Sequence, residues 1–502
     1  MSPEDPVGHL VNDLMARPWG DVSPSVYETG RMVTLAPWLT GHTERMEYLC
    51  AGQRPDGGWG LPDGYDLVPT LSATEGLLSA VDRGDPAPRR GDPKVAAHRG
   101  MAALARRLIH EPWRPLPDMP AIELIVPHLI GLINERFGGA GLPLPPGMSA
   151  APLGRIRDRL KSGGQLPEKL HHALEIAGDS AIFAQTSLTS IGTVGASPAA
   201  TAAYLGDSGL LEPGNPARLH LEAVARRFGG PVPVGLPITV FERGWVLSTL
   251  VRAGVAVDPP AEMVADLAAA IGPAGTPAGP GLPPDCDTTS VALYALGLLG
   301  IPYDPECLLA YELDTHFCTW QGEEGASIST NAHVLDALGR HLSLVPGAVH
   351  HRPRMEKVIT WLAGRQLPDG SWTDRWHASP LYATACAALA LHEYGGPAAR
   401  SHVDRALTWT LANQRENGSW GRWSGTQEET AYALQMLLLA GDARHREAAA
   451  RGHAFLTEED DISEWPPLWH DKDLYLPVSI VRAAMIAARH LSRQNVAAYL
   501  QI

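Results

Sequence analysis

A chain of 502 residues is long enough for about two to four domains of roughly 100–200 residues each. Hydrophobic residues make up 45% of it and charged residues 19%, so it can bury large cores and does not belong to the disordered class. Its formal net charge of −15 excludes a general nucleic-acid-binding protein, because contact with phosphates needs a basic face.

Neither a membrane span nor a disulfide framework is expected. The chain contains no run of about 18 apolar residues, and its first residues lack the apolar core of a signal peptide. The five cysteines are odd in number and widely scattered, with no C-x-x-C pair. We therefore expect free thiols, a reducing compartment and a cytoplasmic protein without integral membrane association.

Helical periodicity dominates the chain. Apolar residues recur at i, i+3, i+4 and i+7 in Ala- and Leu-rich stretches, many of which stop at Gly or Pro. The best strand candidate, residues 231–241, contains prolines and a glycine that demote it to an extended linker. The pattern predicts an all-α fold of short helices. In chain order the clearest helical stretches cover residues 263–272, 290–300, 330–342, 383–395, 429–441 and 477–491.

Two loop-like segments bear on domain organisation. Residues 271–284 are rich in Gly and Pro, but they run directly into Asp285, so we interpret them as a long loop within a domain. We expect the domain boundary earlier, near residues 228–237.

A short repeat, Q-x-x-[DN]-G-x-W, occurs at Gln53–Trp59, Gln366–Trp372 and Gln414–Trp420. Each copy follows an apolar helical stretch, so the glycine ends that helix or makes the turn. The glutamine can bond the loop backbone, and the tryptophan can pack under the next helix. We interpret the repeats as staples of the fold and not as reacting groups.

The sequence Asp-Cys-Asp-Thr-Thr-Ser at residues 285–290 opens the predicted helix 290–300. Helix capping is one interpretation, because Asp and Thr are favoured N-caps and a carboxylate gains about 0.3–1 kcal/mol from the helix dipole. A helix N-terminus also makes a carboxylic acid stronger, whereas a neighbouring carboxylate keeps one proton on the pair. The motif therefore also fits an acid that stays protonated near neutral pH and protonates a weak base such as an alkene.

The same six residues resemble the D-x-D-D-type motif of class II terpene cyclases, in its D-x-D-T-T form. The resemblance implies an all-α protein with two α/α-barrel domains and the active site between them. The β domain would comprise residues 1–20 plus 236–502, and residues 21–235 would form an inserted γ domain. The Q-x-x-[DN]-G-x-W repeats resemble the family's QW motifs, and further resembling segments are residues 23–39, 67–78, 195–206, 240–250, 327–338, 374–385, 425–437 and 467–484.

The resemblance also implies roles at the motif. Asp287 would be the general acid, and Asp285 would orient it and share its proton. Thr288 stands where many relatives have a third Asp, although Thr288 and Thr289 can still form hydrogen bonds. Asn331 would donate an amide N–H to Asp287, and its alternative role is a helix N-cap.

Charged residues elsewhere are candidates for binding a diphosphate and Mg²⁺. Lys472 and Arg375 lie beside aromatic residues, where each can hold a diphosphate oxygen or be a solvated surface cation. The family's γ domain often carries an acidic stretch for Mg²⁺, and the corresponding region here contains Asp118 and Glu123. Residues 460–464 resemble the D-D-x-x-E metal motif of ionisation-type synthases, but we interpret them as a solvated acidic loop.

Aromatic rings stabilise a carbocation without offering it a nucleophile. The aromatic residues in or near the matched segments are therefore candidates for lining the cavity, with a place in the core as the alternative for each. These candidates are Trp245, Trp320, Trp372, Trp376, Tyr382 and Trp423.

Together these features predict a class II terpene cyclase. Its substrate would be a linear prenyl diphosphate, farnesyl or geranylgeranyl diphosphate, with Mg²⁺ bound to the diphosphate. The product would be a bicyclic drimane- or labdane-type diphosphate in which the diphosphate is retained. Substrate chain length and oligomeric state stay open.

Three alternatives remain at this stage. The first is a squalene-type cyclase with a hydrocarbon substrate, and the second is a non-catalytic α/α-barrel binding protein. The third is a protein prenyltransferase subunit whose zinc ligands would be Asp285, Cys286 and His333. Outside that third case, we expect His333 to face the core of its helix and not to relay protons.

Overall fold

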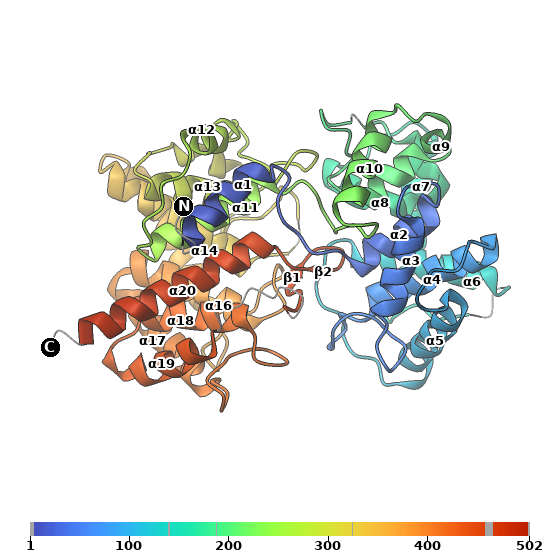
Figure 1. Cartoon of the computed structure of the whole chain (residues 1–502). Coiled ribbons are helices and arrows are strands. Elements are labelled where there is room, and N and C mark those ends of the chain that lie inside the picture. The colour runs from blue at the N-terminus through green and yellow to red at the C-terminus, as the bar shows by residue number, and fades with distance from the viewer. Residues whose placement is uncertain (1–4, 139–140, 187, 324, 457–464, 500–502) are drawn as a thin grey trace.

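The computed structural model describes residues 5–138, 141–186, 188–323, 325–456 and 465–499. These residues are mostly helical and form two lobes (Figure 1). The sheet in the described part of the chain is a two-stranded antiparallel hairpin of β1 (Trp469–His470) and β2 (Leu474–Tyr475). The all-α prediction is confirmed, with this hairpin as a small addition between the lobes.

The large lobe is an α/α barrel formed by α1 and α11–α20. In its inner ring each helix packs on the next, and the last packs back on the first. The inner helices bury nearly all their residues, which explains why their sequences are apolar or small on every side. The ring consists of α11 (Thr239–Arg252), α13 (Cys286–Leu298), α14 (Ile328–Leu344), α16 (Pro380–Tyr394), α18 (Gln427–Leu439) and α20 (Val478–Tyr499).

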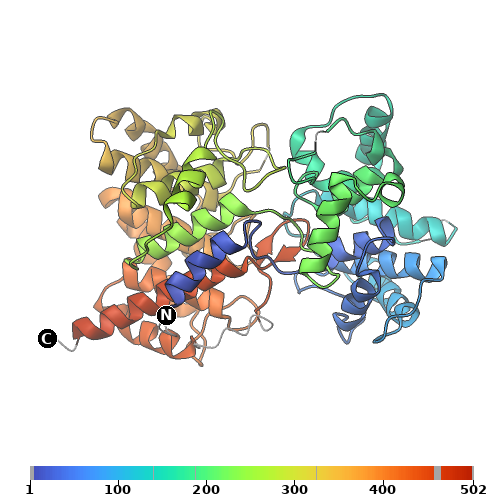
Figure 2. The ribbon, with the colours of Figure 1, turned by 45° about the horizontal axis from the view of Figure 1, so that its top comes forward.

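Outer helices cover this ring, and α1 supplies one of them from the other end of the chain. It packs against α20, beside which it lies in Figures 1 and 2. The others are α12 (Ala261–Ala269), α15 (Arg352–Gly364), α17 (Gly396–Ala412) and α19 (Arg446–Phe455), with the short η3 (Pro305–Tyr311), η4 (Val349–His351) and η5 (Ala443–His445) between them.

The small lobe contains the helices from α2 to α10. Its inner ring joins α2 to α4, α6, η2 and α8, and α8 returns to α2. The division of the chain into two domains with boundaries at 20/21 and 235/236 stays a prediction. The small-lobe elements are α2 (Val26–Leu35), α3 (His42–Ala51), α4 (Leu67–Arg83), α5 (Pro93–Ala105), η1 (Arg106–His110), α6 (Ile122–Arg136), α7 (Ala151–Lys161), η2 (Glu168–Phe183), α8 (Pro198–Leu205), α9 (Ser208–Leu211) and α10 (Pro216–Arg227).

The three repeats fold in the same way and form the same hydrogen bonds. In the last copy, Trp420 is fully buried and its Nε1 donates to the Thr410 carbonyl at 2.7 Å. The Gln414 amide donates to the carbonyls of Gly418, at positive φ, and of Ala448 on α19. Trp59 with Gln53 and Trp372 with Gln366 make the corresponding bonds. The interpretation of the repeats as staples is confirmed.

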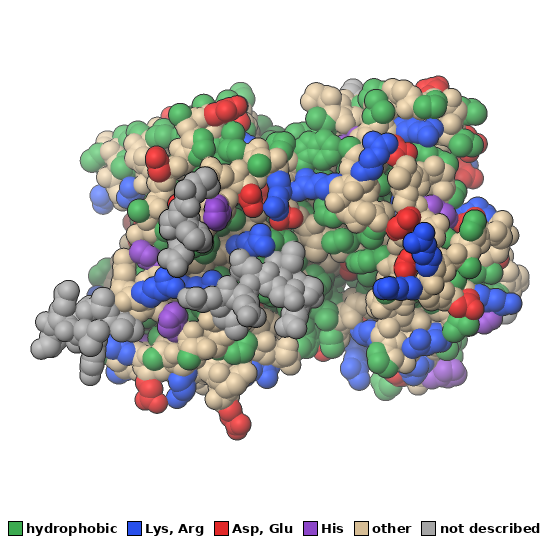
Figure 3. Space-filling view, in the orientation of Figure 1, with side chains coloured by type: hydrophobic (Ala, Val, Ile, Leu, Met, Phe, Trp, Pro, Cys, Tyr) green, Lys and Arg blue, Asp and Glu red, His purple; other side chains and the backbone are tan. Residues whose placement is uncertain are grey.

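The cysteines, the helices and the surface charges also bear on the expectations from the sequence, and the free thiols agree with them. All five cysteines are unpaired. None of the described helices is long and apolar enough to cross a membrane. Acidic and basic side chains are interspersed over both lobes on the face shown in Figure 3, and hydrophobic side chains gather along the seam between the lobes.

We expect Trp420→Ala to lower the free energy of unfolding by about 3–5 kcal/mol, because it removes a fully buried indole and leaves the Thr410 carbonyl without its donor. Urea denaturation followed by circular dichroism measures the change. Trp113→Ala, at a half-buried loop position, is the control and should change stability much less. Equal stability of the Trp420 variant and the wild type would show that the staple contributes nothing.

Candidate active site

A cavity of about 660 Å³ lies between the two lobes. The large lobe lines it with residues at the N-terminal ends of α11 and α13, and the small lobe with residues at the starts of α6 and η2. The hairpin β1–β2 contributes Trp469, His470 and Tyr475. Because both lobes supply walls, the cavity exists only when the lobes are docked.

Asp285 and Asp287 both line this cavity at the start of α13. Asp285 is the N-cap, and its Oδ1 accepts from the backbone N–H of Thr288 at 2.6 Å. Burial raises the pKa of Asp285 to about 7; the Thr288 N–H opposes the shift and the charge of Asp287 adds to it. Capping and acid chemistry are thus compatible, since the capping carboxyl is also a group that holds a proton near neutral pH.

Asp287 bonds a histidine from the neighbouring inner helix. His333 on α14 places its Nδ1 2.7 Å from Oδ1 of Asp287, and both side chains are almost buried. Burial lowers the pKa of His333, but the charge of Asp287 and the hydrogen bond to it outweigh burial, so this pKa stands well above its ordinary value. His333 therefore donates to Asp287. It faces the interior as expected, and its bond to Asp287 was not predicted.

Asn331 does not contact the acid in the way that was expected. Its amide nitrogen donates to the carbonyls of Phe317 and Ser327, and its oxygen accepts from the Phe317 backbone N–H at 2.9 Å. Both amide hydrogens are therefore used within the backbone. The alternative N-cap role is also wrong, because Ser327 is the N-cap of α14. Asn331 holds the loop that precedes α14.

The two threonines of the motif have different places. Thr288 lines the cavity and supplies the N–H that Asp285 accepts. Thr289 is fully buried, and its hydroxyl donates to the Asp285 carbonyl and accepts from the backbone N–H of Thr276. Thr289 thereby ties the Gly- and Pro-rich loop 271–284 to the start of α13, which supports the interpretation of that loop as part of the domain.

The aromatic candidates divide into those that line the cavity and those that do not. Trp320 and Trp376 line it and meet edge to face, with ring centroids 5.2 Å apart. Trp372 belongs to a staple and is fully buried, so the prediction that it lines the cavity is wrong. Trp423 donates to Asp63 and is not among the described residues that line this cavity.

Trp245 and Tyr382 lie deeper, inside the inner ring. Trp245 Nε1 donates to the Tyr382 hydroxyl at 2.9 Å, and its ring meets His333 edge to face. Both line a second cavity of about 70 Å³ on the barrel axis, to which every inner helix contributes. His333 lines this cavity too, so it lies between the small cavity and Asp287.

Sequence reasoning missed three aromatic residues of the main cavity: Phe241, Trp469 and Tyr475. Phe241 packs on Trp245 with ring centroids 4.4 Å apart and meets Trp469 edge to face. All three fall within segments that resemble the family, which is the one signal that pointed to them.

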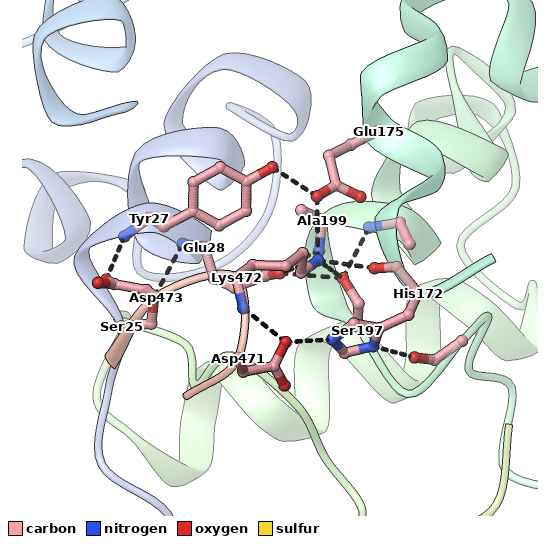
Figure 4. Close-up of polar contacts among 12 residues, drawn as sticks. Ser25, Tyr27, Glu28, His172, Glu175, Ser197, Ala199, Asp471, Lys472 and Asp473 are labelled. Carbon is pink, nitrogen blue, oxygen red and sulfur yellow. Dashed lines mark hydrogen bonds and ion pairs between the residues drawn. The ribbon is translucent and has the colours of Figure 1, made fainter. Parts of the chain in front are cut away.

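Lys472 is among the residues that line this cavity, as predicted, but its ammonium is bound by buried partners and is not available to a diphosphate. It lies in the turn of the hairpin, and its side chain enters the small lobe (Figure 4). There its fully buried ammonium binds Glu28 and, at 2.9 Å, Glu175, and it donates to Ser197 Oγ at 2.8 Å. A further bond goes to the His172 carbonyl. An ammonium with this many buried partners has no donor left for a diphosphate.

The residues beside Lys472 extend the same network. Asp471 Oδ1 lies 2.8 Å from Nε2 of His172, which lines the cavity. Asp473 accepts from Ser25 and from the backbone N–H of Tyr27. Burial raises the pKa of Glu28 to about 7, although the charge of Lys472 opposes the shift. The hairpin turn is thus held by the small lobe at each of its three residues.

Arg375 lines the cavity, as do Asp118 and Glu123. The guanidinium of Arg375 binds Glu323 at 3.1 Å and Asp118 at 3.3 Å. The exposed Lys169 also lines the cavity and was not predicted. The lining of the cavity therefore includes two cations, Arg375 and Lys169, together with carboxylates, which suits a polyanion accompanied by a divalent cation.

The alternative zinc set is not assembled. Among the described residues, the ligand atoms of Asp285, Cys286 and His333 do not lie close enough together to share an ion. The acidic segment 460–464 lies outside the described residues.

Known proteins resemble this chain over most of its length. A family model described as squalene-hopene cyclase C-terminal domain matches residues 324–475. The chain is 44% identical to ent-copalyl diphosphate synthase of Streptomyces sp. (strain KO-3988), over 95% of this chain and 94% of that protein. It is 40% identical to labda-7,13-dienyl diphosphate synthase of Streptomyces clavuligerus, over 97% of this chain and 92% of that protein.

A solved structure has the same fold throughout. The ent-copalyl diphosphate synthase from Streptomyces platensis superposes with a TM-score of 0.92 at 43% identity, and the match covers 97% of this chain and 99% of that one. The two-lobed helical architecture is therefore that of a known enzyme structure.

We expect Lys472→Met to lower the free energy of unfolding by about 3–5 kcal/mol, because it leaves Glu28 and Glu175 buried without their cation. Chemical denaturation measures this loss, with Lys161→Met at an exposed position as the control. Adding Glu28→Gln and Glu175→Gln to Lys472→Met should restore part of the stability, since it removes the unpaired charges. A Lys472→Met variant as stable as the wild type contradicts the assignment.

Proposed function

The chain belongs to the class II terpene cyclases, and on that premise we propose that it cyclises geranylgeranyl diphosphate to a bicyclic labdane-type diphosphate. The names of the two curated relatives, a copalyl and a labdadienyl diphosphate synthase, support a product of this type. The observation that carries the proposal is the pairing of Asp287 with His333 on the wall of an aromatic-lined cavity between the lobes.

In the proposed reaction Asp287 protonates the terminal alkene of the substrate. For this step the acid proton is on Oδ2 of Asp287, while Oδ1 accepts the hydrogen bond from Nδ1 of His333, which holds the carboxyl group in place. Asp285, with a pKa of about 7, is about half protonated at neutral pH. The repulsion between two adjacent carboxylates is thereby reduced when the proton leaves Asp287.

Ring closure then proceeds through carbocations. The new C–H bond at the terminal alkene leaves a cation that the next double bond attacks, and a second attack closes the second ring. Loss of a proton from a neighbouring carbon ends the reaction, and the bond to the diphosphate stays intact. Phe241, Trp469 and Tyr475 would present rings to these cations and keep water out.

Arg375 and Lys169, which both line the cavity, would hold the diphosphate there, and Arg375 is paired with Asp118 and Glu323. Asp118 and Glu123 offer the oxygen ligands that Mg²⁺ prefers, so they would hold an ion that accompanies the substrate. Bound there, Mg²⁺ would neutralise part of the diphosphate charge. The role of these residues is to position the substrate so that its far end reaches Asp287.

We expect Asp287→Asn to reduce turnover by about 100-fold or more, because an amide of the same shape cannot give up a proton to an alkene. Turnover is measured with geranylgeranyl diphosphate, followed by phosphatase treatment and gas chromatography–mass spectrometry. Asp314→Asn, at an exposed position, is the matched control and should keep wild-type activity. A fully active Asp287 variant would show that another group supplies the proton.

The diphosphate should survive the reaction. We expect the product to appear as a free alcohol only after phosphatase treatment, with no pyrophosphate in a coupled assay, because the proposed chemistry breaks no bond to the diphosphate. Farnesyl diphosphate is the comparison substrate, and a higher kcat/KM with it would replace the labdane assignment with a drimane one. Stoichiometric release of pyrophosphate contradicts the proposal for either substrate.

A further inference from the structure

A buried histidine outside the main cavity has no hydrogen-bond partner. His351 ends η4, and its side chain is only 1% exposed. Neither of its ring nitrogens has a partner among the described residues. Buried polar atoms in native proteins are almost always satisfied. An imidazole buried with both nitrogens unpaired therefore indicates a missing partner.

Two further ligand atoms lie beside this histidine. Oε1 of Glu306 on η3 is 3.9 Å from Nε2 of His351 and 3.3 Å from Nε2 of His350. The three residues each offer an atom within 4.8 Å of the others. Around a tetrahedral zinc ion with bonds of about 2.0–2.1 Å, neighbouring ligand atoms lie about 3.3 Å apart. The observed spacing thus needs only small side-chain adjustments to fit one ion.

A third histidine approaches from α14. The ring of His341 meets that of His351 edge to face, with centroids 5.8 Å apart. Nδ1 of His341 is also buried and has no partner among the described residues. His341 does not belong to the group of ligand atoms within 4.8 Å of one another, so it borders the cluster and is not counted among its ligands.

Arg354 is a cation beside the cluster, since its Nη1 donates to the His350 carbonyl at 3.3 Å. Its charge is paired with a carboxylate, because its Nε is bound to Glu312 at 2.9 Å, and Glu312 also holds Lys357.

We propose that Glu306, His350 and His351 bind a transition-metal ion of the zinc class. Imidazole nitrogens suit zinc, cobalt and nickel, whereas Mg²⁺ prefers oxygen ligands. The proposed site differs from the one for the substrate's Mg²⁺, because none of its residues lines the main cavity.

The position of the cluster indicates a structural role. Residues 306–319 lead from Glu306 to Thr319, whose carbonyl accepts from the backbone N–H of Cys286 at 2.9 Å, at the start of the helix that carries Asp287. An ion at the cluster would join this segment to η4. It would therefore fix a loop that supports the active site without contacting the substrate.

The test uses the full-length chain without a histidine tag, stripped with EDTA. Isothermal titration with ZnCl₂ should show one ion per chain, and CoCl₂ should give the visible absorption of tetrahedral cobalt. Zinc should also raise the melting temperature. His350→Gln and Glu306→Gln, both at exposed positions where folding is not at risk, should each weaken zinc binding by about tenfold or more.

The control is His98→Gln, which removes an exposed histidine from the small lobe and should leave zinc binding unchanged. Circular dichroism confirms that each variant is folded. The proposal is overturned if the wild type binds no zinc, if the His350 and Glu306 variants bind it as tightly as the wild type, or if a modest excess of MgCl₂ displaces it. None of these readouts depends on cyclase activity, so the result is independent of the proposed reaction.

Discussion

The buried ammonium of Lys472 is the contact on which the arrangement of the two lobes depends. It belongs to the hairpin of the large lobe, yet its partners Glu28, Glu175 and Ser197 all lie in the small lobe (Figure 4). Burying these charges is tolerable only when they are paired and fully hydrogen-bonded. Because one end of the network is fixed to each lobe, the lobes are held in the one arrangement that forms the cavity.

The surroundings of the proposed acid also depend on the docking of the two lobes, although the acid itself lies on α13 of the large lobe. Helix α13 presents Asp285 and Asp287 at its N-terminus, and the neighbouring inner helix supplies His333. One carboxyl is held by the helix end and the other by an imidazole, so the two resemble each other in sequence but differ in environment. The small lobe supplies the facing wall of the cavity, and the aromatic rings that line the cavity come from the large lobe and the hairpin.

Much of the fold could be predicted from the sequence because it rests on local chemistry. The staples at Trp59, Trp372 and Trp420 use residues within a few positions of each other plus one helix nearby, so a short motif describes them fully. The inner helices could be recognised for the same reason, since their periodic apolar residues reflect burial of each helix by itself. The motif at residues 285–290 predicted both the start of a helix and a pair of neighbouring carboxyl groups.

What the sequence by itself determined was therefore the helical class, the staples and the pair of carboxyl groups at the start of α13. Tertiary structure alone decided the partners. Asn331 and His333 are two residues apart on one helix, and only the packing of α14 on α13 turns His333 toward Asp287 while Asn331 bonds the backbone of Phe317. From the sequence, Lys472 between aromatic residues fits a surface cation. In the folded chain it is surrounded by glutamates that lie 297 and more positions away. Side-chain partners so far apart in the chain leave no local pattern, because the geometry that joins them exists only after the lobes have docked.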